Sequence, residues 1–266
     1  MARRMAWLEP ACVTVAVWFA LTALSASEGG IGLSWDAINH HIYLGWTAGS
    51  HRLDQDFLAA NFQSLQFPYL YWPAYLLASH GAGPVLAAAV LSALHALSAP
   101  ALWLIARALL PGDALQATTL RVMAVMLGYL SPVVLSLSDN TANDLLAATP
   151  LVWAVAFGVL GLAPHLTDRA RWMWVAGAGL LAGVATAFKL SNGPLVVALP
   201  VLWAIGAGPF TARAARIVLG GMSLLAGFAA TYGEWGWQLW LRYGNPLYPF
   251  YDGLFEPLRR LVGWAP

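Results

Sequence analysis

The sequence has little charge, a single lysine and a single cysteine. Asp, Glu, Lys and Arg make up only 9% of its 266 residues, whereas a soluble domain carries about 25% charged residues. This shortage excludes a soluble enzyme and a disordered chain, and a net charge of only +1 excludes a basic protein that binds nucleic acid. With Cys12 as the only cysteine, neither an internal disulfide nor a cysteine-based metal cluster can form.

Long apolar stretches take the place of the missing charge. Hydrophobic residues account for 60% of the chain, and a helix needs roughly 20 mostly apolar residues to cross a hydrocarbon core of about 30 Å. We therefore predict an all-α polytopic membrane protein, with a single membrane domain over residues 1–266 and about seven transmembrane helices. The predicted spans are residues 7–25, 85–105, 122–137, 145–162, 172–188, 194–205 and 217–232.

The arginines predict the orientation of these spans. If the spans alternate in direction, the short loops on the side of the N-terminus contain most of the arginines, which the positive-inside rule assigns to the cytoplasm. These are Arg3, Arg4, Arg107, Arg121, Arg169, Arg171, Arg213 and Arg216. The long first loop (28–84) and the C-terminal segment (234–266) then lie outside the cytoplasm. Because the composition is rich in Arg, Ala, Leu and Gly, as in high-GC bacteria, we expect a bacterial inner membrane.

In this orientation most of the carboxylates fall on the extracytoplasmic side. Acids gathered at one face of a membrane protein favour a polar site there, although long loops also hold more polar residues for no functional reason. The chemically capable residues of this side include Asp36, His40, His41, Asp54, Asp56, Asp139, Asp144, Lys189, Glu234, Asp252 and Glu256.

Residues 35–46 predict an amphipathic helix in the first extracytoplasmic loop. Trp35, Ile38, Ile42 and Trp46 form an apolar face, and the opposite face contains Asp36, His40, Tyr43 and Thr47. Such a helix lies in the membrane interface with Asp36 toward an aqueous cleft. A carboxylate in that position can act as a general base. The structural alternative is that Asp36 caps the helix beside Ser34.

Two pairs of residues could hold a divalent cation. Asp36 and His40 are four residues apart, so both could ligate one ion, whereas His41 points to another face of an α-helix; an unligated His40 is the simpler interpretation. Asp54 and Asp56 share one side if their segment is extended, and oxygen ligands suit Mg²⁺ or Mn²⁺. Such a divalent cation is the only cofactor that the sequence suggests.

Two further segments place polar residues at the ends of predicted spans. In the turn 138–144, Ser138 or Asp139 is expected to cap the fourth span, while Asp139 and Asp144 could also reach a cleft. Lys189 follows the fifth span. Its ammonium either snorkels to the lipid headgroups or pairs with a lipid phosphate.

Four features of the sequence together resemble the C-type membrane glycosyltransferases. They are the acid after Trp35, the aromatic and proline-rich segment 67–73, the segment 188–192 around Lys189, and the Gly-Asn-Pro to Pro-Phe-Tyr segment 244–251. The resemblance is closest to bacterial relatives of the dolichyl-phosphate-mannose protein mannosyltransferases and the aminoarabinose transferases. It covers essentially the whole chain.

The resemblance implies that the protein transfers a sugar from a polyprenyl-phosphate donor to an acceptor outside the cytoplasm, with inversion. Asp36 would be the general base and Asp139 or Asp144 the second acid; some relatives also need a divalent metal. The expected partners are this donor, membrane lipid and an acceptor that the sequence does not identify. The substrate-binding residues would be His40, Tyr43, Arg52, Lys189, Asn192, Arg242 and Asn245.

Relatives usually continue with further helices, whereas this sequence stops at Pro266. We therefore also expect a fragment, a truncated paralogue or one part of a split enzyme that needs a partner chain. The alternative function is a non-catalytic membrane subunit that binds the lipid carrier. A transporter is less favoured, because transporters have polar groups near the midplane and the predicted spans hold little beyond His95 and Thr186.

Overall fold

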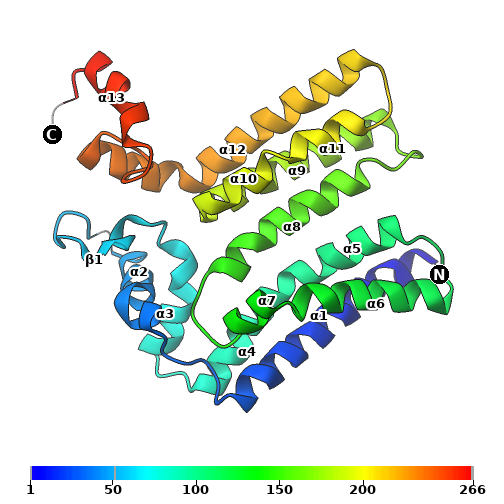
Figure 1. Cartoon of the computed structure of the whole chain (residues 1–266), viewed down its shortest axis with the longest axis horizontal. Helices are drawn as coiled ribbons and strands as arrows, with labels where there is room; N and C mark the ends of the chain where they lie inside the picture. Colours follow the sequence, from blue (N-terminus) through cyan, green and yellow to red (C-terminus); the bar gives the residue numbers. More distant parts are fainter. Residues whose placement is uncertain (1, 51, 265–266) are drawn as a thin grey trace.

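The computed structural model describes residues 2–50 and 52–264, and most of them are helical. The long helices lie side by side, and the N-terminus lies at one end of this bundle (Figure 1). The opposite end carries short helices, the four-residue strand β1 (Ala59–Phe62) and the C-terminal helix α13 (Asp252–Leu261).

Among the residues that the structure describes, three stretches are long and apolar enough to cross a membrane. They are the part of α1 (Ala2–Ser27) from Leu8 onward, the stretch Pro84–Leu109, and α12 (Phe210–Tyr243). The second stretch joins α4 (Pro84–His95), η4 (Ala96–Ser98) and α5 (Ala99–Leu109). The chain is therefore predominantly helical, and the length and composition of these three stretches suggest a membrane protein. The apolar helices Asp144–Leu160 (α8) and Leu190–Ile205 are shorter.

Prolines interrupt two of the predicted spans. The third span is divided into α6 (Leu115–Tyr129) and α7 (Pro132–Leu137), because Pro132 has no N–H to continue a helix. The sixth, predicted over 194–205, is divided into α10 (Gly193–Val196) and α11 (Leu199–Ile205), and η5 (Leu190–Asn192) lies just before it. The last span is longer than its predicted range of 217–232, because α12 continues to Gly244, whose left-handed backbone (φ 61°) ends the helix.

Glycines bring α9 (Asp168–Phe188) and α12 into backbone contact. A Cβ atom on Gly183 would clash with the carbonyl oxygen of Leu224, and one on Gly227 would clash with that of Leu180. Small residues at such positions let membrane helices approach closely. This contact packs α9 directly against α12.

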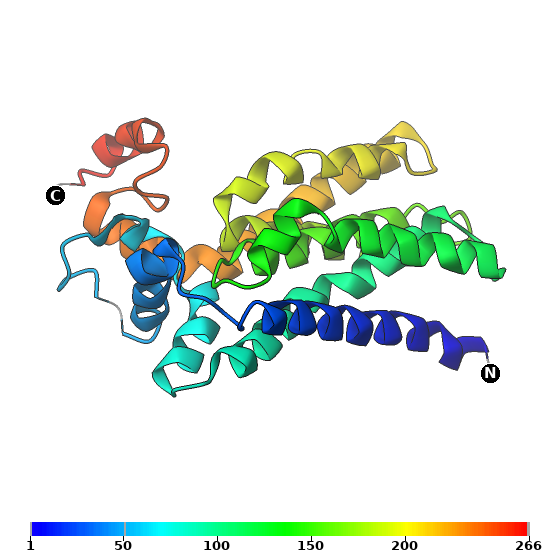
Figure 2. The ribbon, with the colours of Figure 1, turned by 60° about the horizontal axis from the view of Figure 1, so that its bottom comes forward.

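The segment 28–83, which we call the cap layer, covers one end of the bundle (Figure 2). Its helices are η1 (Ala37–His41), α2 (Ile42–Thr47), η2 (Gln63–Leu65), η3 (Tyr69–Tyr71) and α3 (Trp72–Ser79). A buried cluster ties this layer to α12, and the indole of Trp235 donates to the carbonyl of Leu65 at 3.2 Å. The cap layer is therefore held at the ends of α8, α9 and α12, where the polar residues meet.

Candidate functional site

A polar cleft of about 350 Å³ lies between the cap layer and the ends of α8 and α9. It brings together Asp36, His40, Asp144 and Lys189, which come from three distant parts of the sequence. The sequence predicted all four as site residues. The full lining is Ser34, Asp36, His40, His41, Gln63, Gln66, Tyr71, Leu137, Asn140, Ala142, Asp144 and Lys189.

Asp36 has its carboxylate free in the cleft. The helix that contains it begins at Trp35, and Ser34 is its cap, because the Ser34 hydroxyl accepts the Ala37 N–H at 3.1 Å. Asp36 makes no such cap bond, and 58% of its side chain is exposed. The capping interpretation of Asp36 is therefore wrong.

The same helix contains a π-helical segment, η1 (Ala37–His41). A π turn is wider than an α turn, and such segments occur often at functional sites. As a result, His41 lines the cleft together with His40, and their rings are 4.3 Å apart between centroids. The prediction that His41 points to another face is wrong, because it assumed α-helical periodicity.

His41 is packed between Tyr71 of the cap layer and the turn before α8. Its ring stacks on Tyr71 at 4.7 Å, and its Nδ1 lies 2.7 Å from the Thr141 hydroxyl. Burial lowers the pKa of His41 to about 4, with a smaller contribution from the neighbouring His40. His41 is therefore a neutral imidazole at neutral pH.

Lys189 and Asp144, which both line the cleft, form an ion pair. The Lys189 ammonium donates to the Asp144 carboxylate at 2.6 Å and to the Asn143 side-chain oxygen at 3.5 Å. Both side chains of the pair are partly exposed, 34% for Lys189 and 46% for Asp144. Lys189 is thus held by protein groups, with its charge accessible from the cleft.

The turn before α8 differs from its prediction. The helix begins at Asp144 rather than near Ser138, because Asn140 accepts the Ala142 N–H at 2.8 Å and forms a turn of its own. The predicted cap at Ser138 or Asp139 is therefore wrong. Asp139 does not line the cleft, and its backbone carbonyl accepts the Gly32 N–H at 3.0 Å.

Tyr43, Arg52 and Asp56 form a separate closed network in the cap layer. Arg52 donates to both carboxylate oxygens of Asp56, at 2.6 and 2.9 Å, and the Tyr43 hydroxyl donates to Asp56 at 3.1 Å. Burial, together with the bond to Asp56, raises the pKa of Tyr43 to about 12. These three side chains satisfy one another and do not line the cleft.

The two carboxylates predicted to hold a metal ion, Asp54 and Asp56, are bound to different arginines. Asp54 accepts from Arg242 at 2.6 Å, which holds the pKa of its carboxyl below the usual range, while Asp56 is bound to Arg52. Residues 53–55 form a turn, with the Gln55 N–H bonded to the Arg52 carbonyl, and not the extended segment that the prediction required. Among residues 2–50 and 52–264 there is no group of three or more His, Cys, Asp or Glu that could hold a metal ion.

The two predicted asparagines have structural partners. Asn192 donates to the carbonyls of Ala147 and Ala185, at 3.0 and 2.8 Å, and so links α8 to α9. Asn245 is fully buried and donates to the Phe250 carbonyl at 2.9 Å, which closes the turn after α12. Neither residue lines the cleft.

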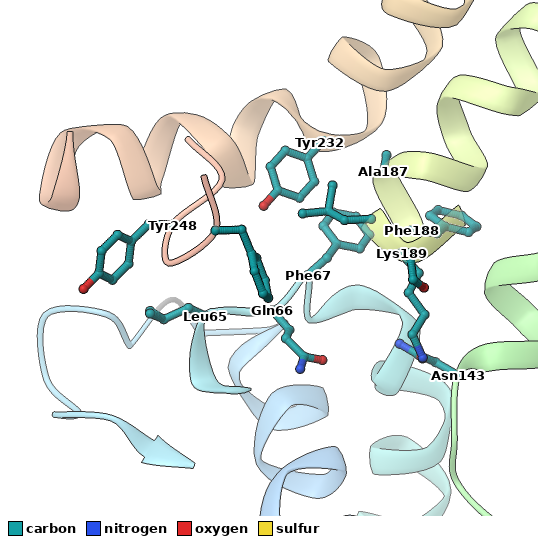
Figure 3. Close-up of a pocket in the computed structure, with 12 residues that line it drawn as sticks. Leu65, Gln66, Phe67, Asn143, Ala187, Phe188, Lys189, Tyr232 and Tyr248 are labelled. Atoms are coloured by element: carbon teal, nitrogen blue, oxygen red, sulfur yellow. The ribbon is translucent and has the colours of Figure 1, made fainter. Parts of the chain in front are cut away.

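An aromatic chamber of about 160 Å³ adjoins the cleft and shares Gln66 and Lys189 with it. Figure 3 shows Lys189 beside Asn143 at one end of this chamber, with Tyr232 and Tyr248 farther away. Its aromatic lining is Phe67, Phe188, Tyr232, Tyr248 and Phe250. Lys189 therefore lies at the boundary between the polar cleft and the aromatic chamber.

Several lining residues had no useful signal in the sequence. Gln63 and Gln66 lie in an irregular segment without periodicity, and Tyr71 stood out only as part of an aromatic stretch. Together the two spaces offer a free carboxylate, an ammonium for an anion and an aromatic surface for an apolar chain.

A scan against protein-family models and searches of curated proteins and of solved structures find no match for the chain.

Proposed function

We propose that the protein is a membrane glycosyltransferase of the C-type kind, which uses a polyprenyl-phosphate sugar as donor. The observation that carries this proposal is the position of Lys189 between the cleft with Asp36 and the aromatic chamber. A lipid-linked sugar has the same order of parts: a polar sugar, a phosphate and an apolar chain.

The donor phosphate would bind at Lys189. An ammonium is a good point charge for phosphate, and the partly exposed pair with Asp144 can exchange its carboxylate for the phosphate. The first isoprene units would occupy the aromatic chamber, since burying each CH₂ group contributes about 0.8 kcal/mol. The sugar would then extend into the cleft toward Asp36.

Asp36 would act as general base on the acceptor. As its carboxylate removes the hydroxyl proton, the acceptor oxygen forms a bond to the anomeric carbon and the bond from that carbon to the phosphate oxygen breaks. Attack from the face opposite the phosphate inverts the anomeric configuration. Polyprenyl phosphate leaves with the bonding electron pair, and Lys189 stabilises its negative charge.

We also propose that the chain crosses a bacterial inner membrane seven times, with the cap layer outside the cytoplasm. The additional spans would be α6 with α7, α8, α9 and the stretch Leu190–Ile205, beside the three longer ones. The helix at residues 35–47 supports an interfacial position for the cap layer. Trp35 is 78% exposed and Ile38 67% exposed, so an apolar face is free to contact lipid.

A second candidate is a membrane subunit that binds the lipid carrier without catalysis. The Lys189–Asp144 ion pair favours this carrier-binding function. If the lipid phosphate replaces the Asp144 carboxylate at Lys189, the lipid carrier is bound without any catalytic step.

The test uses the purified full chain in liposomes, with undecaprenyl-phosphate mannose, glucose and arabinose as donors and extracted bacterial membranes as acceptor. A transferase releases undecaprenyl phosphate and labels an acceptor, and Asp36→Asn still binds donor but releases none. Donor binding without release by the native chain would establish the carrier-binding subunit instead. Neither binding nor release with any of the three donors would contradict both functions.

A further inference from the structure

His40 has a buried imidazole nitrogen without a partner. Only 4% of the residue is exposed, and Nδ1 has no hydrogen-bond partner among the described residues. Buried polar atoms in proteins are nearly always hydrogen-bonded, and one that is not costs about 1–3 kcal/mol. The neighbouring histidine shows the usual case, because Nδ1 of His41 lies 2.7 Å from the Thr141 hydroxyl.

The carboxylate of the proposed base lies near this nitrogen. Nδ1 of His40 lies 3.8 Å from Oδ1 of Asp36, one helical turn earlier. This separation is too long for a hydrogen bond. The Asp36 side chain is 58% exposed, so a rotation within the cleft can bring its carboxylate to bonding distance while the buried imidazole stays in place.

We infer that His40 is a positioning residue for Asp36: its Nδ1, unprotonated in the neutral tautomer that carries hydrogen on Nε2, faces Asp36 and receives the proton that Asp36 removes from the acceptor. This inference rests on the proposed glycosyl transfer. In the first step the acceptor O–H bond breaks and an O–H bond forms on Asp36, while the sugar passes from the phosphate to the acceptor. In the second step the Asp36 O–H bond breaks and an N–H bond forms at Nδ1 of His40, which restores the carboxylate and leaves an imidazolium that loses its proton to water.

The surroundings of His40 keep it able to accept a proton. It is faced by Asp36 and His41 from its own helix, by Tyr71 from η3, by Asp144 from α8 and by Lys189 after α9. Burial lowers the pKa of His40, the Asp36 carboxylate raises it and Lys189 lowers it again. The net pKa lies below that of a free histidine, so the imidazole is neutral at neutral pH.

The first experiment compares transfer by the native chain, His40→Ala and His40→Asn in liposomes, with undecaprenyl-phosphate sugars as donors. Asn presents an amide N–H near the place of Nδ1 but cannot take up a proton. Since proton transfer by a positioned group contributes about 10²–10⁴-fold, we expect both variants to lower kcat at least roughly tenfold, with the donor KM unchanged. The pH at which kcat falls on the acid side should also move down in His40→Asn.

The control is His80→Asn, an exposed histidine at the end of α3 that is expected to keep native rates. Full rescue of kcat and of the pH profile by His40→Asn would overturn the inference and leave the proposed function standing. Absence of transfer by the native chain would instead overturn the proposed function, and this inference with it.

A second measurement does not depend on activity. In a sample with isotope-labelled histidine, NMR follows the titration of the His40 imidazole. Its signal is assigned as the one missing from the spectrum of His40→Asn. We expect its pKa to fall in Asp36→Asn, because the carboxylate that raises it is removed. An unchanged titration would show that the two groups do not interact and would overturn the inference.

Discussion

The Lys189–Asp144 ion pair illustrates what a single residue contributes to the proposed site. The ammonium is the only lysine charge of the chain, and it is partly exposed between the cleft and the aromatic chamber. We expect Lys189→Gln to raise the donor KM about tenfold, the equivalent of about 1.4 kcal/mol, with a smaller change in kcat. Asp144→Asn should lower the donor KM, because it removes the group that competes with the phosphate.

Steady-state kinetics with a defined donor separate these effects. Arg242→Gln is the matched control, since Arg242 pairs with Asp54 away from the cleft and its loss should leave the donor KM unchanged. A Lys189→Gln variant with native KM would contradict a phosphate site at this residue.

His41 makes the stability of the cap layer depend on pH. Its pKa is about 4 in the folded protein and about 6.5 for an unperturbed histidine. Between these two pKa values the unfolded chain binds a proton that the folded chain does not. The free energy of unfolding therefore falls as the pH drops from 6.5 to 4, and the contribution of His41 stays constant below pH 4. Thermal unfolding in detergent at pH 7, 5 and 4 should show a smaller loss for His41→Gln than for the native chain. An equal loss would contradict a buried neutral His41.

At the scale of elements, apolar stretches predict where helices lie better than how they begin and end. The apolar runs indicated α1, the stretch Pro84–Leu109 and the middle of α12. The end of α12 is decided by the left-handed backbone of Gly244, and the segment Ala37–His41 forms a π-helix, which the sequence pattern did not indicate. Helical periodicity in a sequence is interpreted on the assumption of a regular α-helix. The position of His41 in the lining of the cleft could therefore not be predicted.

The contact between α9 and α12 gives a prediction at this scale. Gly183→Ala would place a methyl group against the backbone of α12, and overpacking of this kind costs about 1–3 kcal/mol. Gly221→Ala is the control in α12, because its added Cβ meets nothing within 4 Å and alanine favours helix by about 1 kcal/mol. The unfolding temperature in detergent should drop for Gly183→Ala only. An unchanged Gly183→Ala variant would mean that the helices are not in backbone contact.

For the whole molecule, the sequence anticipated the meeting of Asp36, Asp144 and Lys189 better than the other site residues. Topology alone places these three at one end of the bundle, because they follow or precede long helices. The family resemblance implied five further binding residues, but each is bound instead to another group of the protein: Tyr43, Arg52, Arg242, Asn192 and Asn245. Such pairings depend on side-chain geometry, which a linear pattern does not contain.

The orientation of the whole chain is tested by reporter fusions. A phosphatase or fluorescent reporter fused after His165 should report the cytoplasm, because the neighbouring loop carries Arg169 and Arg171. The same reporter after Asp252, beyond α12, should report the opposite side. The reverse result would place the polar cleft on the cytoplasmic face and contradict the proposed orientation.

The most direct test of the transferase site is the rate of sugar transfer by Asp36→Asn relative to Asp139→Asn. Both variants replace an acid by its neutral amide, but only Asp36 lines the cleft. We predict that Asp36→Asn lowers kcat at least about 100-fold, as expected for loss of a general base, while Asp139→Asn keeps native kcat. Native transfer by Asp36→Asn would contradict the assignment of the cleft as the catalytic site.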